Sequence, residues 1–391
     1  MRKLTYALFM AGLLSCPALS PAADPPAKPK IPIPAFDDVL EAWGLTLNGY
    51  ADVSYSYLTG NGTFVDSGLA TRAFDARHNS FSVHQAAFTL AKQPKEGFGG
   101  LVNLIAGQDA DVISSNGSGS GDNFDVTQAW VQYATGPLTV IGGKFVTLAG
   151  AEVINPTQDT NFSRSILFLY AIPFSHTGGR ATYAVNDKLS LVAGVNNGWD
   201  QLSDLNSSKT AEVGVSYAPL KNLSVAAQGY FGNEVPNPGL FPNQSGFRSL
   251  VDVVATYNAT DKLTLILNGD WGAQKNAALA AADVTGNNTA RWYGVAAYGI
   301  YQFTDQWRGS LRAEYFDDKD GFRTGVRQQW KEVTLTMAYL PTKNIELRGE
   351  VRYDRSNGSS SITGLPGAFA KPDGNLSKNQ ASVGLEALYK F

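Results

Sequence analysis

The chain has 391 residues, of which 43% are hydrophobic and 17% charged, and its formal net charge is −3. No window reaches the ~18 consecutive apolar residues of a transmembrane helix, which excludes a helical membrane protein. Such mild acidity gives no reason to expect a nucleic-acid partner.

The first residues have the pattern of a secretory signal peptide. Arg2 and Lys3 precede an apolar window that ends at Leu14, and small residues follow, so we predict a cleaved leader over residues 1–23. The single cysteine, Cys16, lies inside this leader, and the mature chain would carry no thiol. A lipoprotein signal that retains Cys16 is the alternative.

Two short segments follow the leader. Residues 24–35 belong to a proline-rich stretch that cannot sustain a helix or a sheet ladder, and we predict an extended tether. Within residues 36–44, apolar side chains recur at i, i+3, i+4 and i+7 and a glycine follows, which predicts a short amphipathic helix. This helix leads into the strands or, alternatively, forms a plug or an oligomer contact.

From residue 45 onward the chain alternates between apolar and polar residues with the two-residue period of β-strands. Seven short turns and eight long, Gly-rich connections join sixteen such segments. A tyrosine marks most of the short turns and is followed six residues later by a large apolar residue, as in Tyr183 and Leu189. Short connections at one end and long ones at the other are typical of a transmembrane barrel with periplasmic turns and outer loops.

The predicted fold class is therefore all-β, a closed antiparallel transmembrane β-barrel of sixteen strands over residues 45–391. Apolar side chains such as Val251, Val253 and Tyr257 share one parity, which we assign to the lipid-facing side, with the repeated tyrosines as an aromatic girdle. A soluble β-protein whose core takes these residues is the alternative. The last strand ends on Phe391, an ending that resembles the signal read by the barrel assembly machinery.

Charged residues gather on the opposite parity of the last strands. Since an Arg near the membrane midplane costs about 2 to 4 kcal/mol on the lipid side, we expect these side chains to face the lumen and to line the pore. The predicted pore-lining residues are Arg308, Arg312, Glu314, Glu346, Arg348, Glu350, Arg352 and Glu386. They set solute preference in a water-filled pore or, alternatively, close the lumen through Arg–carboxylate pairs.

The connection from Gly150 to Ser175 contains an apolar run that would be awkward on an exposed outer loop. We predict that it folds back into the barrel as a constriction loop, with Glu152, Asp159 or Arg164 reaching the lumen. An extra strand, or packing against a partner subunit, is the alternative.

No catalytic or metal motif emerges from the residues. The three histidines, His78, His84 and His176, lie near loop ends without a nucleophile motif, so we interpret them as surface or rim residues and predict no enzyme. The acidic run that starts at Asp317 lacks the ligand spacing of a calcium loop. We therefore expect no cofactor and no metal.

Several stretches together resemble the OmpL-like β-barrel porin family. They are the signal peptide, LNGYADVSYSY, NPTQDTNFSRSILFLYAIPFSHTGGRATYA and the terminal ALYKF. The resemblance spans residues 45–391 and implies an outer-membrane pore. It implies no binding residue, because the solutes of the family are mostly unassigned.

We therefore expect a porin in the outer membrane of a Gram-negative bacterium, with both termini in the periplasm, through which small hydrophilic solutes or ions diffuse passively. A non-conducting barrel that acts structurally or in adhesion through its outer loops is the alternative. The expected partners are outer-membrane lipid and lipopolysaccharide, the assembly machinery at Phe391 and, by analogy with other porins, further copies of the chain.

Overall fold

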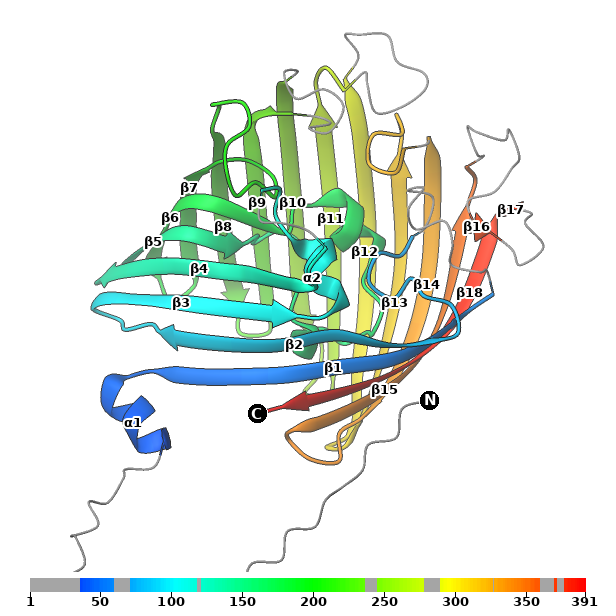
Figure 1. Cartoon of the computed structure of the whole chain (residues 1–391), viewed down its shortest axis with the longest axis horizontal. Coiled ribbons are helices and arrows are strands. Elements are labelled where there is room, and N and C mark those ends of the chain that lie inside the picture. The colour runs from blue at the N-terminus through cyan, green and yellow to red at the C-terminus, as the bar shows by residue number, and fades with distance from the viewer. Residues whose placement is uncertain are drawn as a thin grey trace, which may run out of the picture.

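The structure is a computed structural model that describes residues 36–59, 71–117, 121–235, 245–277, 289–325, 327–358, 369–370 and 376–391. The predicted signal peptide and tether lie outside these residues. Sixteen antiparallel strands form a closed barrel in which every strand pairs with two neighbours (Figure 1). The predicted sixteen-stranded transmembrane barrel is confirmed.

The strands of the barrel wall follow one another in chain order, and β18 closes the ring between β15 and β1. Their bounds are β1 Thr46–Leu58, β2 Ser80–Lys92, β3 Gly97–Ala106, β4 Phe124–Thr135, β5 Leu138–Val146, β6 Ser175–Asn186, β7 Leu189–Asn196, β8 Thr210–Leu220, β9 Leu223–Glu234, β10 Gly246–Asn258, β11 Leu263–Gln274, β12 Ala290–Thr304, β13 Trp307–Asp318, β14 Gln328–Tyr339, β15 Ile345–Ser356 and β18 Asn379–Lys390. Short and long connections alternate along the chain, as the sequence predicts.

Few elements lie outside the wall. A two-stranded sheet consists of β16 (Phe369–Ala370) and β17 (Leu376–Ser377), and the helical elements are α1 (Phe36–Trp43), α2 (Gln108–Ile113), the 3-10 turn η2 (Pro156–Gln158) and the π-helical turn η3 (Leu167–Ala171). No helix among the described residues is long and apolar enough to cross a membrane.

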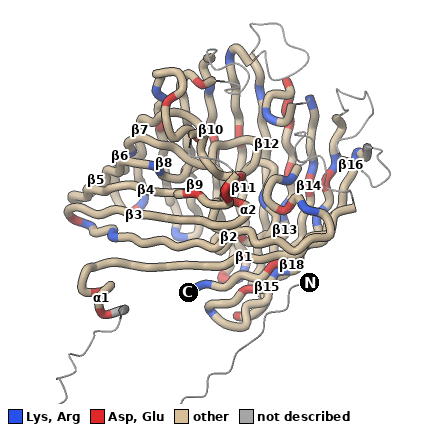
Figure 2. The backbone as a smooth tube through the Cα atoms, in the orientation of Figure 1, with Lys and Arg blue, Asp and Glu red and all other residues tan. Residues whose placement is uncertain are grey.

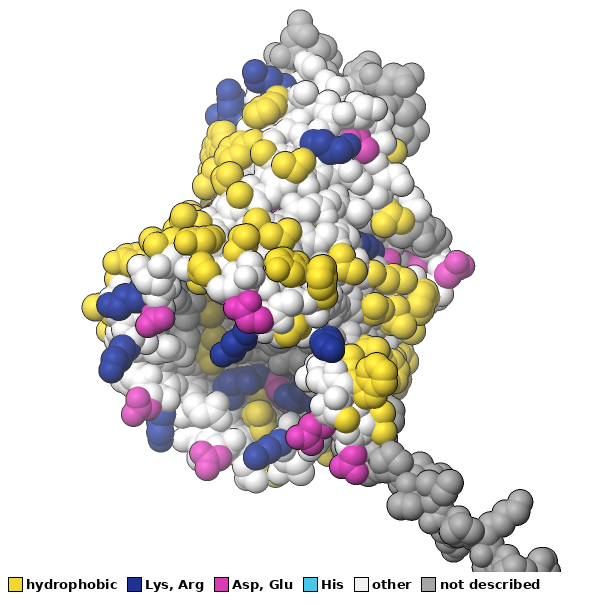
Figure 3. All heavy atoms as spheres, turned by 90° about the vertical axis from the view of Figure 1, so that its left-hand side faces the viewer, with side chains coloured by type: hydrophobic (Ala, Val, Ile, Leu, Met, Phe, Trp, Pro, Cys, Tyr) yellow, Lys and Arg dark blue, Asp and Glu magenta, His cyan; other side chains and the backbone are white. Residues whose placement is uncertain are grey.

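Apolar side chains cover the outer face of the wall. Val251, Val253 and Tyr257 on β10 are exposed, as are Val333 and Leu335 on β14, and the inward-facing residues between them are mostly buried. Figure 3 shows part of this face as a band of hydrophobic side chains above a hollow that has charged side chains on its rim and inside it. The alternation agrees with the parity predicted from the sequence.

The closing strand β18 joins the two ends of the sheet. Tyr389 pairs with Ala51 of β1 on one side and with Ile345 of β15 on the other. The ring of Phe391 packs edge-on against Phe88 of β2, with ring centres 5.5 Å apart. The end of the chain therefore closes the barrel, as the alternation of its last residues indicates.

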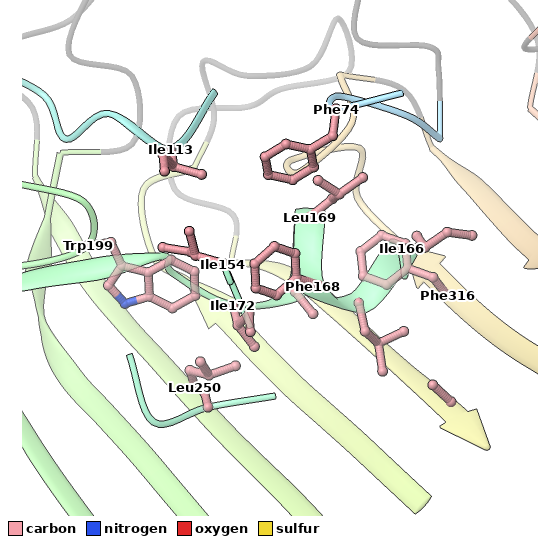
Figure 4. Packing of buried hydrophobic residues seen from close by; sticks show 14 of the residues in the cluster. Phe74, Ile113, Ile154, Ile166, Phe168, Leu169, Ile172, Trp199, Leu250 and Phe316 are labelled. Carbon is pink, nitrogen blue, oxygen red and sulfur yellow. The ribbon is translucent and has the colours of Figure 1, made fainter. Parts of the chain in front are cut away.

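A hydrophobic cluster fills part of the barrel interior. Phe168 and Ile172 come from the connection between β5 and β6, Trp199 and Phe74 come from two other connections, and Phe316 comes from the inward face of β13 (Figure 4). All of these side chains are buried. Connections that lie far apart in the sequence thus share one core with the wall.

Two buried carboxylates face each other without a positive partner. Asp252 of β10 and Asp270 of β11 are paired in the sheet register, and both carboxylate oxygens of Asp270 and one of Asp252 accept no hydrogen bond from any other residue within the described ranges. Asn268 donates to the other oxygen of Asp252 at 2.6 Å. Like charges in such a place destabilise one another, because burial removes the water that would screen them.

Replacing one of these carboxylates by its amide is therefore expected to stabilise the barrel. We expect Asp270→Asn to raise the free energy of unfolding by about 1 to 3 kcal/mol, the range for an unsatisfied buried polar group. Thermal unfolding in detergent would measure the change, with Asp305→Asn in the exposed β12–β13 turn as the matched control. A lower unfolding temperature for Asp270→Asn than for the control would contradict this interpretation.

Candidate permeation site

Residues 147–174, which connect β5 to β6, lie inside the barrel and are called the inserted segment below. Thr147 N–H donates to the carbonyl oxygen of Phe174 at 3.0 Å, which closes the neck of the segment where it leaves the wall. Its apolar run from Ile166 to Ile172 contains η3 and is buried, apart from the partly buried Tyr170. On an outer loop an apolar run of this kind would be exposed to water, whereas inside the barrel it packs against other side chains.

Glycines on the wall make room for two large side chains of the segment. A Cβ atom at Gly294 of β12 would lie 2.8 Å from a methyl carbon of Leu167, and one at Gly384 of β18 would lie 2.6 Å from the ring of Phe162. These close approaches place the segment directly against strands on the charged side of the barrel.

The sheet register arranges the charged wall in layers along β13, β14, β15 and β18. Arg308 lies level with Arg348 and Glu386. Arg312 lies level with Arg352, two inward-facing positions further along the strands. A layer with Glu350 separates these two basic layers, and an acidic layer with Glu314, Glu332 and Asp354 lies beyond them. Figure 2 shows this concentration of both signs of charge on neighbouring strands.

Three wall arginines bind backbone carbonyl groups of the inserted segment. The Arg348 guanidinium donates to the carbonyl oxygens of Asp159 at 2.7 Å, of Pro156 at 3.1 Å and of Asn161 at 3.2 Å. Arg312 donates to the carbonyl oxygen of Ser163 at 2.6 Å.

The third arginine binds the carbonyl group of the next residue in the segment after Ser163. Arg352 donates to the carbonyl oxygen of Arg164 at 2.7 Å. The planar guanidinium, with five N–H donors, suits such multiple contacts.

Two wall carboxylates bind the N–H groups of the same segment. Glu350 accepts from Phe162 N–H at 2.8 Å and from Ser163 N–H at 3.1 Å. Glu314 accepts from Ile166 N–H at 2.9 Å and from Leu167 N–H at 3.3 Å. The charged wall therefore supplies hydrogen bonds that this irregular backbone cannot make to itself.

Charges on the segment complete the network. Glu152 lies 2.6 Å from Arg312, measured from Oε1 to Nη1, and its other oxygen accepts from Ser165 N–H at 2.7 Å. Arg164 pairs with Asp159 at 3.2 Å. All three predicted loop residues, Glu152, Asp159 and Arg164, are buried inside the barrel, and Glu152 contacts the wall directly.

The remaining predicted residues lie on the same wall, toward its short turns. Glu346 pairs with both Arg308 and Arg348, and Arg348 also lies 2.9 Å from Glu386. Arg308 keeps 17% of its side chain exposed, while the other predicted wall residues are almost fully buried. Their role in lining the pore stays a prediction; in the structure their side chains contact each other and the inserted segment.

One charged residue of this wall was absent from the sequence prediction. Glu332 of β14 lies 3.2 Å from Arg312 and is buried. Its strand runs toward a short turn, and apart from the closing strand β18 only strands that run away from short turns supplied predicted residues. The alternation with the outward-facing Val333 and Leu335 is the signal that places it inside.

The opposite side of the segment faces mostly uncharged side chains. Two cavities, of about 230 and 340 Å³, lie between residues 153–158 and the first strands of the barrel. Tyr50, Thr89, Asn155 and Gln158 line both of them. Inward parity in β1–β4 predicts these wall residues, but their lack of charge left them out of the candidate list.

The prediction that His84 and His176 are surface or rim residues is wrong. His84 is buried, with Nε2 2.7 Å from the Ser54 hydroxyl and Nδ1 2.9 Å from Asp109. His176 is buried against the ring of Tyr230, with ring centres 4.6 Å apart. Both occupy inward positions near the ends of β2 and β6 that follow long connections, and the packing inside the barrel covers them.

Ser54, His84 and Asp109 have the order of a hydrolase triad but not its surroundings. The Ser54 hydroxyl is buried, and the edge of the Phe162 ring lies against His84, with ring centres 5.6 Å apart. A nucleophile needs space for a substrate and donors for an oxyanion. We interpret the three residues as a structural hydrogen-bond network that links β1, β2 and α2. The absence of enzymatic activity stays a prediction.

Comparison with known protein families decides the assignment. The family model described as "Putative beta-barrel porin-2, OmpL-like" matches residues 44–391. The chain belongs to this family of porins. It is an outer-membrane porin of a Gram-negative bacterium, a barrel for passive diffusion of solutes, as the sequence predicts. No curated protein matches the chain.

Solved structures agree with the fold of this porin. An anion-selective porin from Comamonas acidovorans superposes with a TM-score of 0.61 at 12% identity, over 89% of this chain and 99% of that one. The outer membrane channel DcaP of Acinetobacter baumannii gives 0.59 at 12% identity, over 89% and 97%. The trimer form of OmpT from Vibrio cholerae gives 0.58 at 14% identity, over 89% and 99%. At such identities the likeness shows the fold alone.

Proposed function

We propose that small hydrophilic solutes and ions diffuse through the part of the lumen that the inserted segment leaves free, so that this segment is the constriction of the pore. The observation that carries the proposal is the set of contacts between the segment and the charged wall. Arg312, Arg348, Arg352, Glu314 and Glu350 all bind backbone atoms of residues 156–167.

In this proposal the wall charges act on permeation in two ways. They hold the constriction in place, and they contribute to the electric field that a permeating ion meets. Their burial favours the first role, because a charged group that is paired and removed from water is poorly placed to exchange contacts with a passing solute. Arg308, which is partly exposed toward the short turns, is the best placed for the second.

Conductance in a planar lipid bilayer tests the proposal. We expect the purified full-length porin to form ohmic channels whose conductance scales with the salt concentration, because solutes move by diffusion. A heat-denatured sample of the same preparation is the control. A barrel that inserts without any conductance at any voltage would leave only the structural or adhesive alternative.

The orientation and the partners of the barrel belong to the same proposal. An even number of strands puts both ends of the wall on one side, which we assign to the periplasm, with the long connections outside. The trimer form of the similar OmpT favours a homo-oligomer. Contacts with lipopolysaccharide, and recognition of Phe391 by the assembly machinery, stay predictions.

A further inference from the structure

The two cavities beside residues 153–158 differ chemically from the rest of the lumen. The side chains that line the smaller one include Tyr50, Thr89, Asn103, Gln128 and Asn155, and none of the described residues in its lining is charged. The larger one opens toward the short-turn end, and its described lining includes Lys390 and the chain-terminal residue Phe391. The layers of paired charge lie on the other side of the inserted segment.

Several polar groups in this lining have no partner within the described part of the chain. The side-chain oxygen of Asn155 accepts hydrogen bonds from Thr157, but the side-chain amide nitrogen donates to no protein atom there. The Gln158 side chain makes no hydrogen bond to described residues, and the Gln128 amide accepts but does not donate. The hydroxyl of Thr127 is buried and unpaired.

An aromatic ring lies beside these amides. The hydroxyl of Tyr50 is bound to Gln85 at 2.7 Å, so Tyr50 contributes its ring to both cavities. Amides supply donors and acceptors to hydroxyl groups, and a ring supplies an apolar face for C–H groups.

We infer that permeating solutes pass these two cavities, and that the cavities admit small neutral polyhydroxylated solutes, such as aldoses, in preference to ions of the same size. The inference rests on the proposed function and names its solute class. A neutral polyol exchanges its hydrogen bonds to water for bonds to Asn155, Gln158 and Gln128, which keeps its polar groups satisfied. An ion loses hydration in the same place, and the described lining of the smaller cavity offers it no opposite charge.

Liposome swelling with matched solutes tests the inference. Glucose, gluconate and glucosamine share a carbon skeleton and are neutral, anionic and cationic at neutral pH. We expect glucose to enter proteoliposomes of the full-length porin about tenfold faster than either ion, a ratio that corresponds to a difference of about 1.4 kcal/mol between barriers. Entry of gluconate or glucosamine at the rate of glucose or faster would overturn the inference.

Two matched variants test where the solutes pass. Gln158→Glu adds one negative charge to both cavities with little change of shape, and we expect it to raise the glucosamine rate over the gluconate rate. Asn222→Asp adds the same charge in the β8–β9 turn and is expected to leave that ratio unchanged. Equal ratios in the two variants would show that solutes do not pass Gln158. A porin that admits no solute and carries no current would instead refute the proposed function.

Discussion

Deletion of Asn155–Arg164 is expected to raise the single-channel conductance of the porin several-fold. These residues form the part of the inserted segment that lies between the layered charges and the two cavities. Removing them joins the two sides of the lumen and widens the path for hydrated ions. Conductance grows with the open cross-section of a water-filled pore, so the change should be visible in single-channel steps.

The geometry of the segment makes this deletion feasible. The N–H group of Ser165 donates to Glu152 at 2.7 Å, and the Arg164 guanidinium reaches the carbonyl oxygen of Ile154 at 2.9 Å. The chain thus returns to within side-chain reach of the place where it left.

A second variant separates the loss of contacts from the loss of chain. Replacing the same residues by an equally long Gly/Ser linker keeps the bulk of the backbone but removes the side chains of Asn155 and Gln158. We expect a noisier current with a smaller rise in conductance than in the deletion. A folded deletion variant with the conductance of the unaltered porin would show that residues 155–164 do not limit permeation.

The strands of the barrel wall can be predicted from local sequence patterns, because each lipid-facing strand must have apolar residues at every second position. The closing strand illustrates this: alternation alone assigned Glu386 to the lumen, where it pairs with Arg348. The apolar run from Ile166 to Ile172 likewise indicated that its connection leaves the outer surface. Both predictions depend only on neighbouring residues.

The partners inside the lumen could not be predicted in the same way. They depend on the stagger between strands, which shifts equal positions relative to one another. Arg312 of β13 and Glu350 of β15 occupy the same position when residues are counted from the short turns that precede these strands. In the sheet, however, Arg312 lies level with Arg352. His84 and His176 are buried because connections between strands cover them, and no pattern among neighbouring residues predicts such contacts.

Neutralising Arg312, Arg348 and Arg352 together is the second change from which we expect a large effect. The sequence predicts that the triple Gln variant shifts the reversal potential toward cations, because the carboxylates of the wall lose their positive partners. The structure adds a mechanical effect. The carbonyl groups of Asp159, Ser163 and Arg164 lose their donors, and the inserted segment becomes free to move.

A triple Lys variant distinguishes the electrical effect from the mechanical one. Lys keeps the charge but lacks the planar fork of Arg, so it cannot make the same set of carbonyl contacts. We expect the Lys variant to keep the reversal potential and to show current noise from the loosened segment, whereas the Gln variant shows both changes. Arg291→Gln, at an exposed position of β12, is the control for a lost charge outside the lumen.

The measurement is the reversal potential in a tenfold KCl gradient together with the current noise at fixed voltage. Breaking a buried pair costs about 3 to 5 kcal/mol, so the single variant Arg352→Gln serves if the triple variants fail to fold. Arg352 lies between Asp354 and the carbonyl oxygen of Arg164, so its loss alone frees one contact of the segment. A quiet current with an unshifted reversal potential in folded Gln variants would mean that the charged wall neither holds the constriction nor sets the field in the pore.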